Sequence, residues 1–188
     1  MFTGIVQAVG RIVRAQPFEV DCDTLDRADL AVGDSVCVQG VCLTVTALTP
    51  RGFTADVSSA TLGVTTGLDR PGPVNLEKSL ALSGRLGGHL VAGHVDGVGE
   101  VTRLEGGALE VRAPDELARY IARKGSICID GVSLTVNRVE ASLFEVFLIP
   151  HTLEVTTLKR LRPGAQVNLE VDLIARYVER LLSPSAGV

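Results

Sequence analysis

The sequence contains no tryptophan, and aromatic residues make up only 4% of it. Hydrophobic residues nevertheless reach 46%, so the core of the folded chain has to be mainly aliphatic. No apolar stretch approaches the roughly 18 residues that a membrane-spanning helix needs, and no membrane contact is expected. The opening Met1-Phe2-Thr3-Gly4 lacks the basic start and apolar run of a signal peptide. These absences predict a cytoplasmic protein.

The charge and cysteine patterns exclude two further kinds of site. The net charge is −4 and the 18 Lys and Arg residues are scattered, whereas a nucleic-acid-binding surface needs a basic patch. The cysteines form no C-x-x-C pair and have no histidine at metal-ligand spacing, so no metal site is expected. In a reducing compartment they are expected to be free thiols. The four are Cys22, Cys37, Cys42 and Cys128.

An internal repeat organises the chain. Gly40-Val41-Cys42-Leu43-Thr44-Val45 returns 91 residues later as Gly131-Val132-Ser133-Leu134-Thr135-Val136, with a single substitution, Cys to Ser. Such a period is the size of a small domain rather than of a solenoid unit. The two halves are therefore expected to share one fold. Shorter matches keep the same order: Gly4-Ile5-Val6 with Gly93-His94-Val95, Thr61-Leu62 with Thr152-Leu153, and Val74-Asn75-Leu76-Glu77 with Val167-Asn168-Leu169-Glu170.

Short segments rich in Val, Ile and Thr, separated by turn residues, predict about six strands in each half. This spacing is typical of small antiparallel barrels, so the predicted fold is all-β, with two tandem six-stranded barrels. We expect domains at residues 1–86 and 87–171, followed by a tail at 172–188. The predicted strand segments are 2–13, 35–46 with a turn at Gly40, 52–57, 62–68, 74–77, 95–103, 108–112, 126–139, 144–149 and 166–171.

Helices are expected at residues 24–30, 114–123 and 172–182. Pro114 in the first turn and Gly125 just past the end support the second of these. In the tail the apolar period becomes helical, and Ser183-Pro184 ends the pattern. The tail helix either lies on its own barrel or packs against copies of itself, and the pattern leaves both open. Its apolar stripe consists of Val171, Ile174, Val178, Leu181 and Leu182.

Several of these motifs resemble the riboflavin synthase family, and the resemblance covers the whole chain. The resemblance implies two Greek-key barrels and a C-terminal helix through which homotrimers assemble. It places each active site between the N-terminal barrel of one subunit and the C-terminal barrel of the next. The motifs are Met1-Phe2-Thr3-Gly4-Ile5-Val6-Gln7, the repeated Gly-Val-Cys/Ser-Leu-Thr-Val, Gly87-Gly88-His89-Leu90, Gly93-His94-Val95 and Ile149-Pro150-His151-Thr152-Leu153.

The implied reaction is a dismutation of two molecules of 6,7-dimethyl-8-ribityllumazine. A four-carbon unit passes between them and gives riboflavin and 5-amino-6-ribitylamino-2,4-pyrimidinedione. The resemblance implies no metal and no redox cofactor, and it makes lumazine synthase a possible partner. Two copies of one substrate must be held face to face, which accounts for the doubled fold. Orienting the two molecules is then the main contribution of the protein to catalysis.

The predicted catalytic residues are His94, Ser133, Thr135 and Cys42, and the resemblance assigns further residues to ligand contacts. In the first barrel it implies ring and ribityl contacts from Gly4, Ile5, Val6, Cys42, Leu43, Thr44, Asp56, Val57, Ser58, Ser59, Ala60 and Thr61. In the second it implies contacts from Gly93, His94, Val95, Lys124, Ser133, Leu134, Thr135, Ile149, Pro150, His151, Thr152, Leu153 and Glu154.

The residue chemistry fits these roles. The C7 methyl group of one lumazine must lose a proton, and histidine titrates near neutral pH, so His94 is the expected acid–base group. It stands where the first repeat has Ile5, so the two pockets cannot play identical roles. Cys42 and Ser133 are a second unequal pair that can hydrogen-bond the ring or add to C7. His89 is expected to be structural.

Two other functions deserve comparison. A lumazine-binding protein without chemistry would need only one competent pocket, whereas both repeats are intact here. A flavin-dependent reductase would need a glycine-rich phosphate loop after a strand, and the sequence has none.

Overall fold

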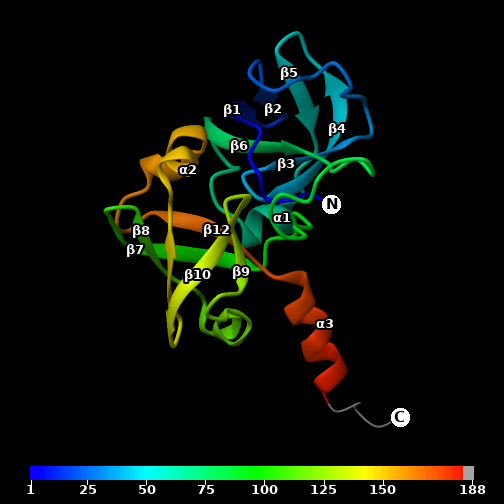
Figure 1. Ribbon diagram of the computed structural model, residues 1–188. Coiled ribbons are helices and arrows are strands. Elements are labelled where there is room, and N and C mark those ends of the chain that lie inside the picture. The colour runs from blue at the N-terminus through cyan, green and yellow to red at the C-terminus, as the bar shows by residue number, and fades with distance from the viewer. Residues whose placement is uncertain (184–188) are drawn as a thin grey trace.

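The computed structural model describes residues 1–183 and consists of two closed six-stranded antiparallel barrels followed by a helix. Both barrels and the helix can be followed in Figure 1. The predicted all-β class, with its two barrels and C-terminal helix, is confirmed. The predicted boundary between residues 86 and 87 falls in the linker that joins the barrels. Residues 184–188 of the predicted tail lie outside the described residues.

The two barrels have one topology. The first closes in the order β1-β2-β5-β4-β3-β6, and the second in the matching order β7-β8-β11-β10-β9-β12. The strands of the first are β1 Ala8–Ala15, β2 Phe18–Asp21, β3 Ser35–Val38, β4 Val41–Leu48, β5 Gly52–Ala55 and β6 Gly72–Lys78. Those of the second are β7 Gly97–Glu105, β8 Ala108–Arg112, β9 Ser126–Ile129, β10 Val132–Glu140, β11 Leu143–Phe147 and β12 Gln166–Val171.

Alternation along the strands fills each barrel with aliphatic side chains. In β4 and β10, Leu43 and Leu134 point inward and are buried, while their neighbours on either side are more exposed. Each core contains a phenylalanine at an equivalent position, Phe53 in β5 and Phe144 in β11, and Phe18 adds a second one to the first core. Burial of such side chains contributes roughly 1.5–3 kcal/mol each, so the period-two pattern carries most of the fold.

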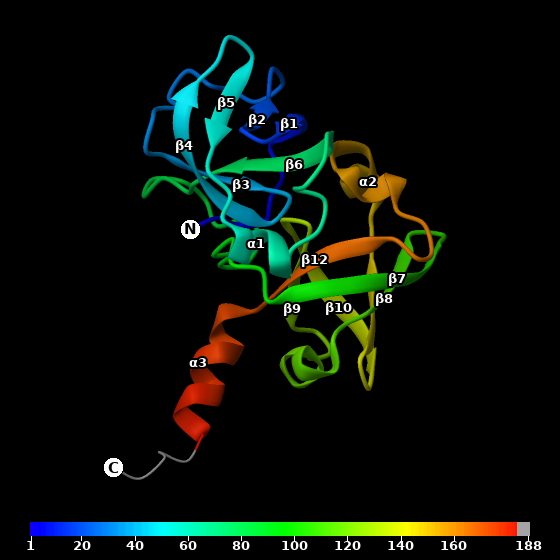
Figure 2. The ribbon, with the colours of Figure 1, turned by 180° about the vertical axis from the view of Figure 1, so that it is seen from behind.

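Short helical segments connect the strands, and Figure 2 shows two of them from behind. The sequence analysis did not predict α1 and α2, which occupy equivalent places after β5 and β11. No helix among residues 1–183 is long and apolar enough to cross a membrane. The helical segments are α1 Ser59–Val64, the 3₁₀ helix η1 Asp115–Tyr120, α2 Pro150–Val155, the 3₁₀ helix η2 Thr157–Arg160 and α3 Leu173–Leu182.

Four predicted elements differ from the structure. Residues 62–68 are predicted as a strand, whereas residues 59–64 form α1 and no strand lies between β5 and β6. Residues 24–30 form separate turns and no helix, because the side chain of Asp26 accepts the N–H of Ala28 and only i→i+3 bonds close the turns. Residues 114–123 form a 3₁₀ helix of six residues rather than an α-helix. The first strand begins at Ala8, because Phe2 instead pairs with Val91 across the two barrels.

A polar seam with approximate two-fold symmetry joins the barrels. The Asn75 side chain donates to the Asp130 carbonyl at 2.8 Å, and the Asn168 side chain donates to the Gln39 carbonyl at 2.9 Å. The backbone N–H of Asn168 in turn donates to Asp130 Oδ1 at 2.8 Å. Because these groups are buried and hydrogen-bonded, they fix how one barrel sits on the other.

Asp130 makes this seam sensitive to pH. Burial raises its pKa to about 7, against a usual 3.8, and the N–H of Asn168 opposes the rise. The folded state therefore holds a proton that the unfolded chain releases above its lower pKa. The resulting stability is complete below the usual pKa of 3.8 and is lost as the pH rises from there through about 7.

We expect Asp130→Asn to flatten this dependence, since asparagine keeps the acceptor and removes the charge. Between about pH 5 and about pH 8, the free energy of unfolding should fall by about 1–3 kcal/mol less in the variant than in the wild type. Urea denaturation at the two pH values measures the difference. Asp69→Asn, at an exposed carboxylate, is the control. Equal slopes for the wild type and Asp130→Asn would contradict the prediction.

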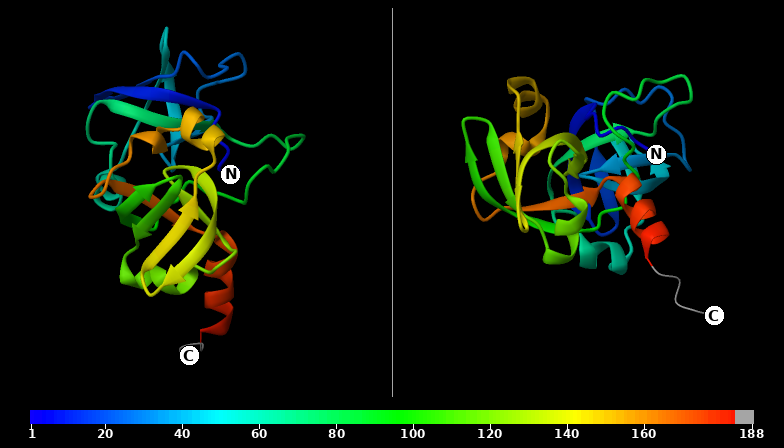
Figure 3. Two further views of the ribbon diagram at one scale, coloured as in Figure 1. Left: turned by 60° about the vertical axis from the view of Figure 1, so that its left-hand side comes forward. Right: turned by 60° about the horizontal axis from the view of Figure 1, so that its bottom comes forward.

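Helix α3 leaves the end of β12 and runs away from the first barrel (Figure 1; Figure 3). Asp172 caps it by accepting the N–H of Ile174 at 3.0 Å. The helix meets its own barrel through polar groups, including Tyr120, which donates to Glu179 at 2.5 Å. None of its residues is buried. Its exposed apolar residues are Ile174, Tyr177, Val178, Leu181 and Leu182.

Candidate active site

The first residues of each repeat lie against the opposite barrel. The backbone N–H of Ser133 donates to the Gly4 carbonyl, and that of Cys42 donates to the Gly93 carbonyl, both at 2.8 Å. Val6 accordingly packs on the core of the second barrel and Val95 on that of the first. The prediction places Gly4, Ile5 and Val6 among the contacts of the first barrel, with Cys42. They lie instead beside Ser133 of the second barrel, and the segment Gly93-His94-Val95 lies beside Cys42 of the first, so this grouping is wrong.

Two glycines make this close approach possible. Gly4 has φ +72° and Gly93 has φ +78°, a conformation that favours glycine. A Cβ on Gly4 would lie 2.6 Å from the Cβ of Ser133, and one on Gly93 would lie 2.7 Å from the Cβ of Cys42. The backbone at each repeat start therefore touches the strand that carries the candidate reactive side chain.

Two buried glutamates hold these repeat starts. Glu77 accepts the N–H groups of Thr3 and Gly4 at 2.7 and 2.9 Å. Glu170 accepts those of Gly93 and His94, both at 2.9 Å. Burial raises the pKa of both carboxyls, and the donated hydrogen bonds oppose that rise. Neither glutamate is among the predicted site residues, although both end the repeated Val-Asn-Leu-Glu motif.

We call the group around Cys42 the first site; it comprises Cys42, Thr44, His94 and Val95. Cys42 and Thr44 alternate with buried residues and so lie on the outer face of β4. His94 is exposed and follows Gly93 directly. Val57 and Leu62, from the segment around α1, pack on the first barrel core together with Val95. Segments from both halves of the chain therefore line this site.

The second site comprises Ser133, Thr135, His89 and Ile5. Ser133 Oγ lies 2.7 Å from Nδ1 of His89. Burial lowers the pKa of His89, while the carboxylate of Asp172 acts in the opposite direction. A neutral imidazole at this position can accept the Ser133 proton and make the hydroxyl more nucleophilic.

Sequence reasoning treated His89 as structural, whereas the structure places its ring against Ser133. The repeat comparison could not find it, because Gly87-Gly88-His89 lies in the linker and has no counterpart in the first repeat. The position of this segment inside a family-like motif was the available signal. His89 Nε2 is buried and has no hydrogen-bond partner among the described residues.

Lys124 occupies a strained backbone position near the second site. Its φ is +68°, and its N–H donates to the Val136 carbonyl at 2.8 Å. In the first repeat, Gly33 makes the equivalent bond to Val45 at 2.9 Å. A lysine where the backbone favours glycine costs about 1 kcal/mol or more.

The remaining predicted contacts divide by exposure. Leu43 and Leu134 point into the barrels, so only their backbone groups can reach a ligand. The segments at α1 and α2 have no fully buried helical residue, although Val57 packs on the first barrel core and Leu153 on the second. The predicted residues of these segments are Asp56, Val57, Ser58, Ser59, Ala60, Thr61, Ile149, Pro150, His151, Thr152, Leu153 and Glu154.

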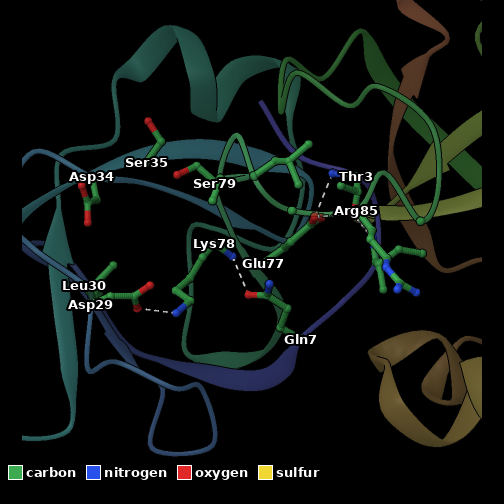
Figure 4. A pocket seen from close by; sticks show the side chains of 15 residues that line it. Thr3, Gln7, Asp29, Leu30, Asp34, Ser35, Glu77, Lys78, Ser79 and Arg85 are labelled. Carbon is green, nitrogen blue, oxygen red and sulfur yellow. Dashed lines mark hydrogen bonds and ion pairs between the residues drawn. The ribbon is translucent and has the colours of Figure 1, made fainter.

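A cavity of about 530 Å³ lies between the first barrel and the linker (Figure 4). Of the predicted ligand residues it contains Ile5 alone. Two of its lining contacts are internal: Gln7 accepts the Lys78 N–H at 2.9 Å, and the Lys78 side chain pairs with Asp29. A smaller hollow of about 210 Å³ is lined in part by Asp56 and Val57.

Comparison with known proteins identifies the family. The model of the lumazine binding domain matches residues 3–79 and again 92–172. A riboflavin synthase of Photobacterium phosphoreum is 46% identical over 194 residues, covering 97% of this chain and 89% of the relative. One of Mycobacterium tuberculosis is 47% identical over 203 residues and covers both chains completely.

Solved structures agree on the fold. LumP complexed with riboflavin has a TM-score of 0.76 at 26% identity, covering 91% of this chain and 99% of that one. LumP complexed with 6,7-dimethyl-8-(1'-D-ribityl) lumazine has a TM-score of 0.77 at 24% identity. The chain belongs to the riboflavin synthase family, and each of its halves is a lumazine binding domain.

Proposed function

We propose that this chain is an enzyme that converts two molecules of 6,7-dimethyl-8-ribityllumazine into riboflavin and 5-amino-6-ribitylamino-2,4-pyrimidinedione. The observation that supports this most directly is a pair of sites at equivalent places in the two barrels with different reactive groups, Cys42 and His94 in one and Ser133 and His89 in the other. Two equivalent scaffolds suit two copies of one substrate. Different reactive groups suit a reaction in which one copy gives four carbons and the other receives them.

The residues divide the chemistry. His94, exposed beside the first barrel, is suited to take a proton from the C7 methyl group of a bound lumazine. Ser133, with His89 as acceptor of its proton, is suited to add to the ring at C7 or to hydrogen-bond it. Thr135 and Lys124 contact the substrate at the second site, and Cys42 and Thr44 contact it at the first. Holding the two rings in register supplies several kcal/mol of the barrier reduction.

The proposal includes assembly into a homotrimer through α3, with each active site formed between neighbouring subunits. Two observations support it. The apolar stripe of α3 is uncovered, with Leu181 83% exposed, and none of the helix residues is buried against its own barrel. A cytoplasmic location and an association with lumazine synthase stay predictions.

The direct test is to mix the purified protein with dimethylribityllumazine, without added cofactor. We expect riboflavin and the pyrimidinedione in equal amounts, with two lumazines consumed for each riboflavin. Absorbance and chromatography follow all three compounds. A lumazine-binding protein without chemistry, the alternative represented by the LumP structures, would bind the substrate and leave it unchanged.

A further inference from the structure

Arg176, in the second turn of α3, reaches from the tail helix to the first site. Its Nη2 donates to the carbonyl of His94 at 2.9 Å and to Oδ2 of Asp96 at 2.8 Å. The same Asp96 oxygen accepts the N–H of Val171, at the end of β12, at 2.8 Å. The segment that carries His94 is thereby tied both to the last strand and to the tail helix.

The main chain of His94 is held on both sides. The carboxylate of Glu170 accepts its N–H at 2.9 Å, and the guanidinium of Arg176 binds its carbonyl. Both contacts involve a charged partner, and such hydrogen bonds are about twice as strong as neutral ones. Since the peptide groups on either side of the Cα are fixed, the direction of the imidazole is restricted to its own side-chain rotations.

The first repeat shows what this region looks like without the arginine. There Gln7 stands in place of Asp96 and accepts the N–H of Lys78 at 2.9 Å, so a neutral amide is enough to tie the strand. In the second repeat the carboxylate of Asp96 accepts the equivalent strand N–H, that of Val171, although the Asp96 side chain is only 17% exposed. Burying that charge requires a cationic partner, and Arg176 supplies it. The repeat with Gln7 has Ile5 where the repeat with Asp96 has His94.

We propose that Arg176 is a positioning residue for His94, and that through it the seating of the tail helix sets the geometry of the first site. This inference rests on the proposed function. It gives the helix a second role besides assembly, because the contact is made within one chain. Association of the helices and the alignment of His94 are then linked through Asp96.

The test uses Arg176→Gln in the full chain. We expect kcat to fall roughly 10- to 100-fold with a change in KM of less than about threefold, because a displacement of about 1 Å in a catalytic group costs up to 100-fold. Arg176→Lys should recover part of the loss, since one cation can still reach Asp96. Arg180→Gln, at an exposed position on the same helix, is the matched control and should keep the wild-type rate.

A second readout does not depend on turnover. The chain has three histidines, so their imidazole NMR signals can be told apart. Arg176→Gln should shift the His94 signal and leave that of His151 in place, in particles of unchanged size by light scattering. An unchanged His94 signal with unchanged kcat overturns the inference, as does a loss of activity that occurs only when the assembly dissociates. A wild-type protein that makes no riboflavin would instead overturn the proposed function, and the NMR signal would still test the contact.

Discussion

Replacing His94 by alanine is expected to lower the turnover of dimethylribityllumazine by roughly 100-fold or more, the range that one acid–base group contributes. Ser133→Ala should have a comparable effect, because it removes the hydroxyl and leaves the half-buried ring of His89 without its partner. Riboflavin affinity should change much less, since most ring contacts are expected from backbone and from residues that stay in place. Steady-state rates and fluorescence titration with riboflavin measure the two effects separately.

The structure adds a control to this prediction. Because Ser133 and His89 are hydrogen-bonded, they should behave as one unit, so His89→Gln combined with Ser133→Ala should be hardly worse than either change alone. His94→Ala acts at the other site and should lower the rate further when added. Equal losses in affinity and in rate would show that His94 and Ser133 are only walls of the sites.

Deleting the chain from Asp172 onward should leave folded barrels in a smaller particle with little activity. The physical reason is the uncovered stripe of α3, in which Ile174 is 66% and Leu181 83% exposed. Exposed apolar side chains at this density are typical of a helix that packs against other helices. Light scattering measures the particle size, and circular dichroism shows whether the barrels remain folded.

The deletion also removes Arg176 and Glu179, so a sharper variant keeps the helix and changes only its stripe. Ile174→Glu with Leu181→Glu should dissociate the assembly and lower activity by at least about tenfold, since charges buried between helices carry several kcal/mol of cost. Arg180→Glu, outside the stripe, is the matched control. A particle of unchanged size and activity after the double substitution would show that α3 is not the assembly element.

The sequence alone determined the duplication and the fold class, because both are written in local patterns. Period-two alternation in segments such as 41–48 and 132–140 requires one buried and one exposed face, and a repeat of 91 residues requires that the solution be used twice. It also identified the unequal pairs Cys42 with Ser133 and Ile5 with His94, since a repeat makes every exception visible. Short turn-rich stretches such as 24–30 were predicted less well, because Asp26 offers the backbone a competing partner.

Only the tertiary structure decided which groups meet. The first residues of each repeat lie against the opposite barrel through the hydrogen bonds from Ser133 to Gly4 and from Cys42 to Gly93. No local periodicity encodes a contact between segments so far apart in the chain. The pairing of His89 with Ser133 and of Arg176 with Asp96 likewise follows from how the linker and α3 lie on the closed barrels. Sequence patterns specify which face of each element is buried, whereas the docking of completed barrels specifies which polar groups come within hydrogen-bonding distance.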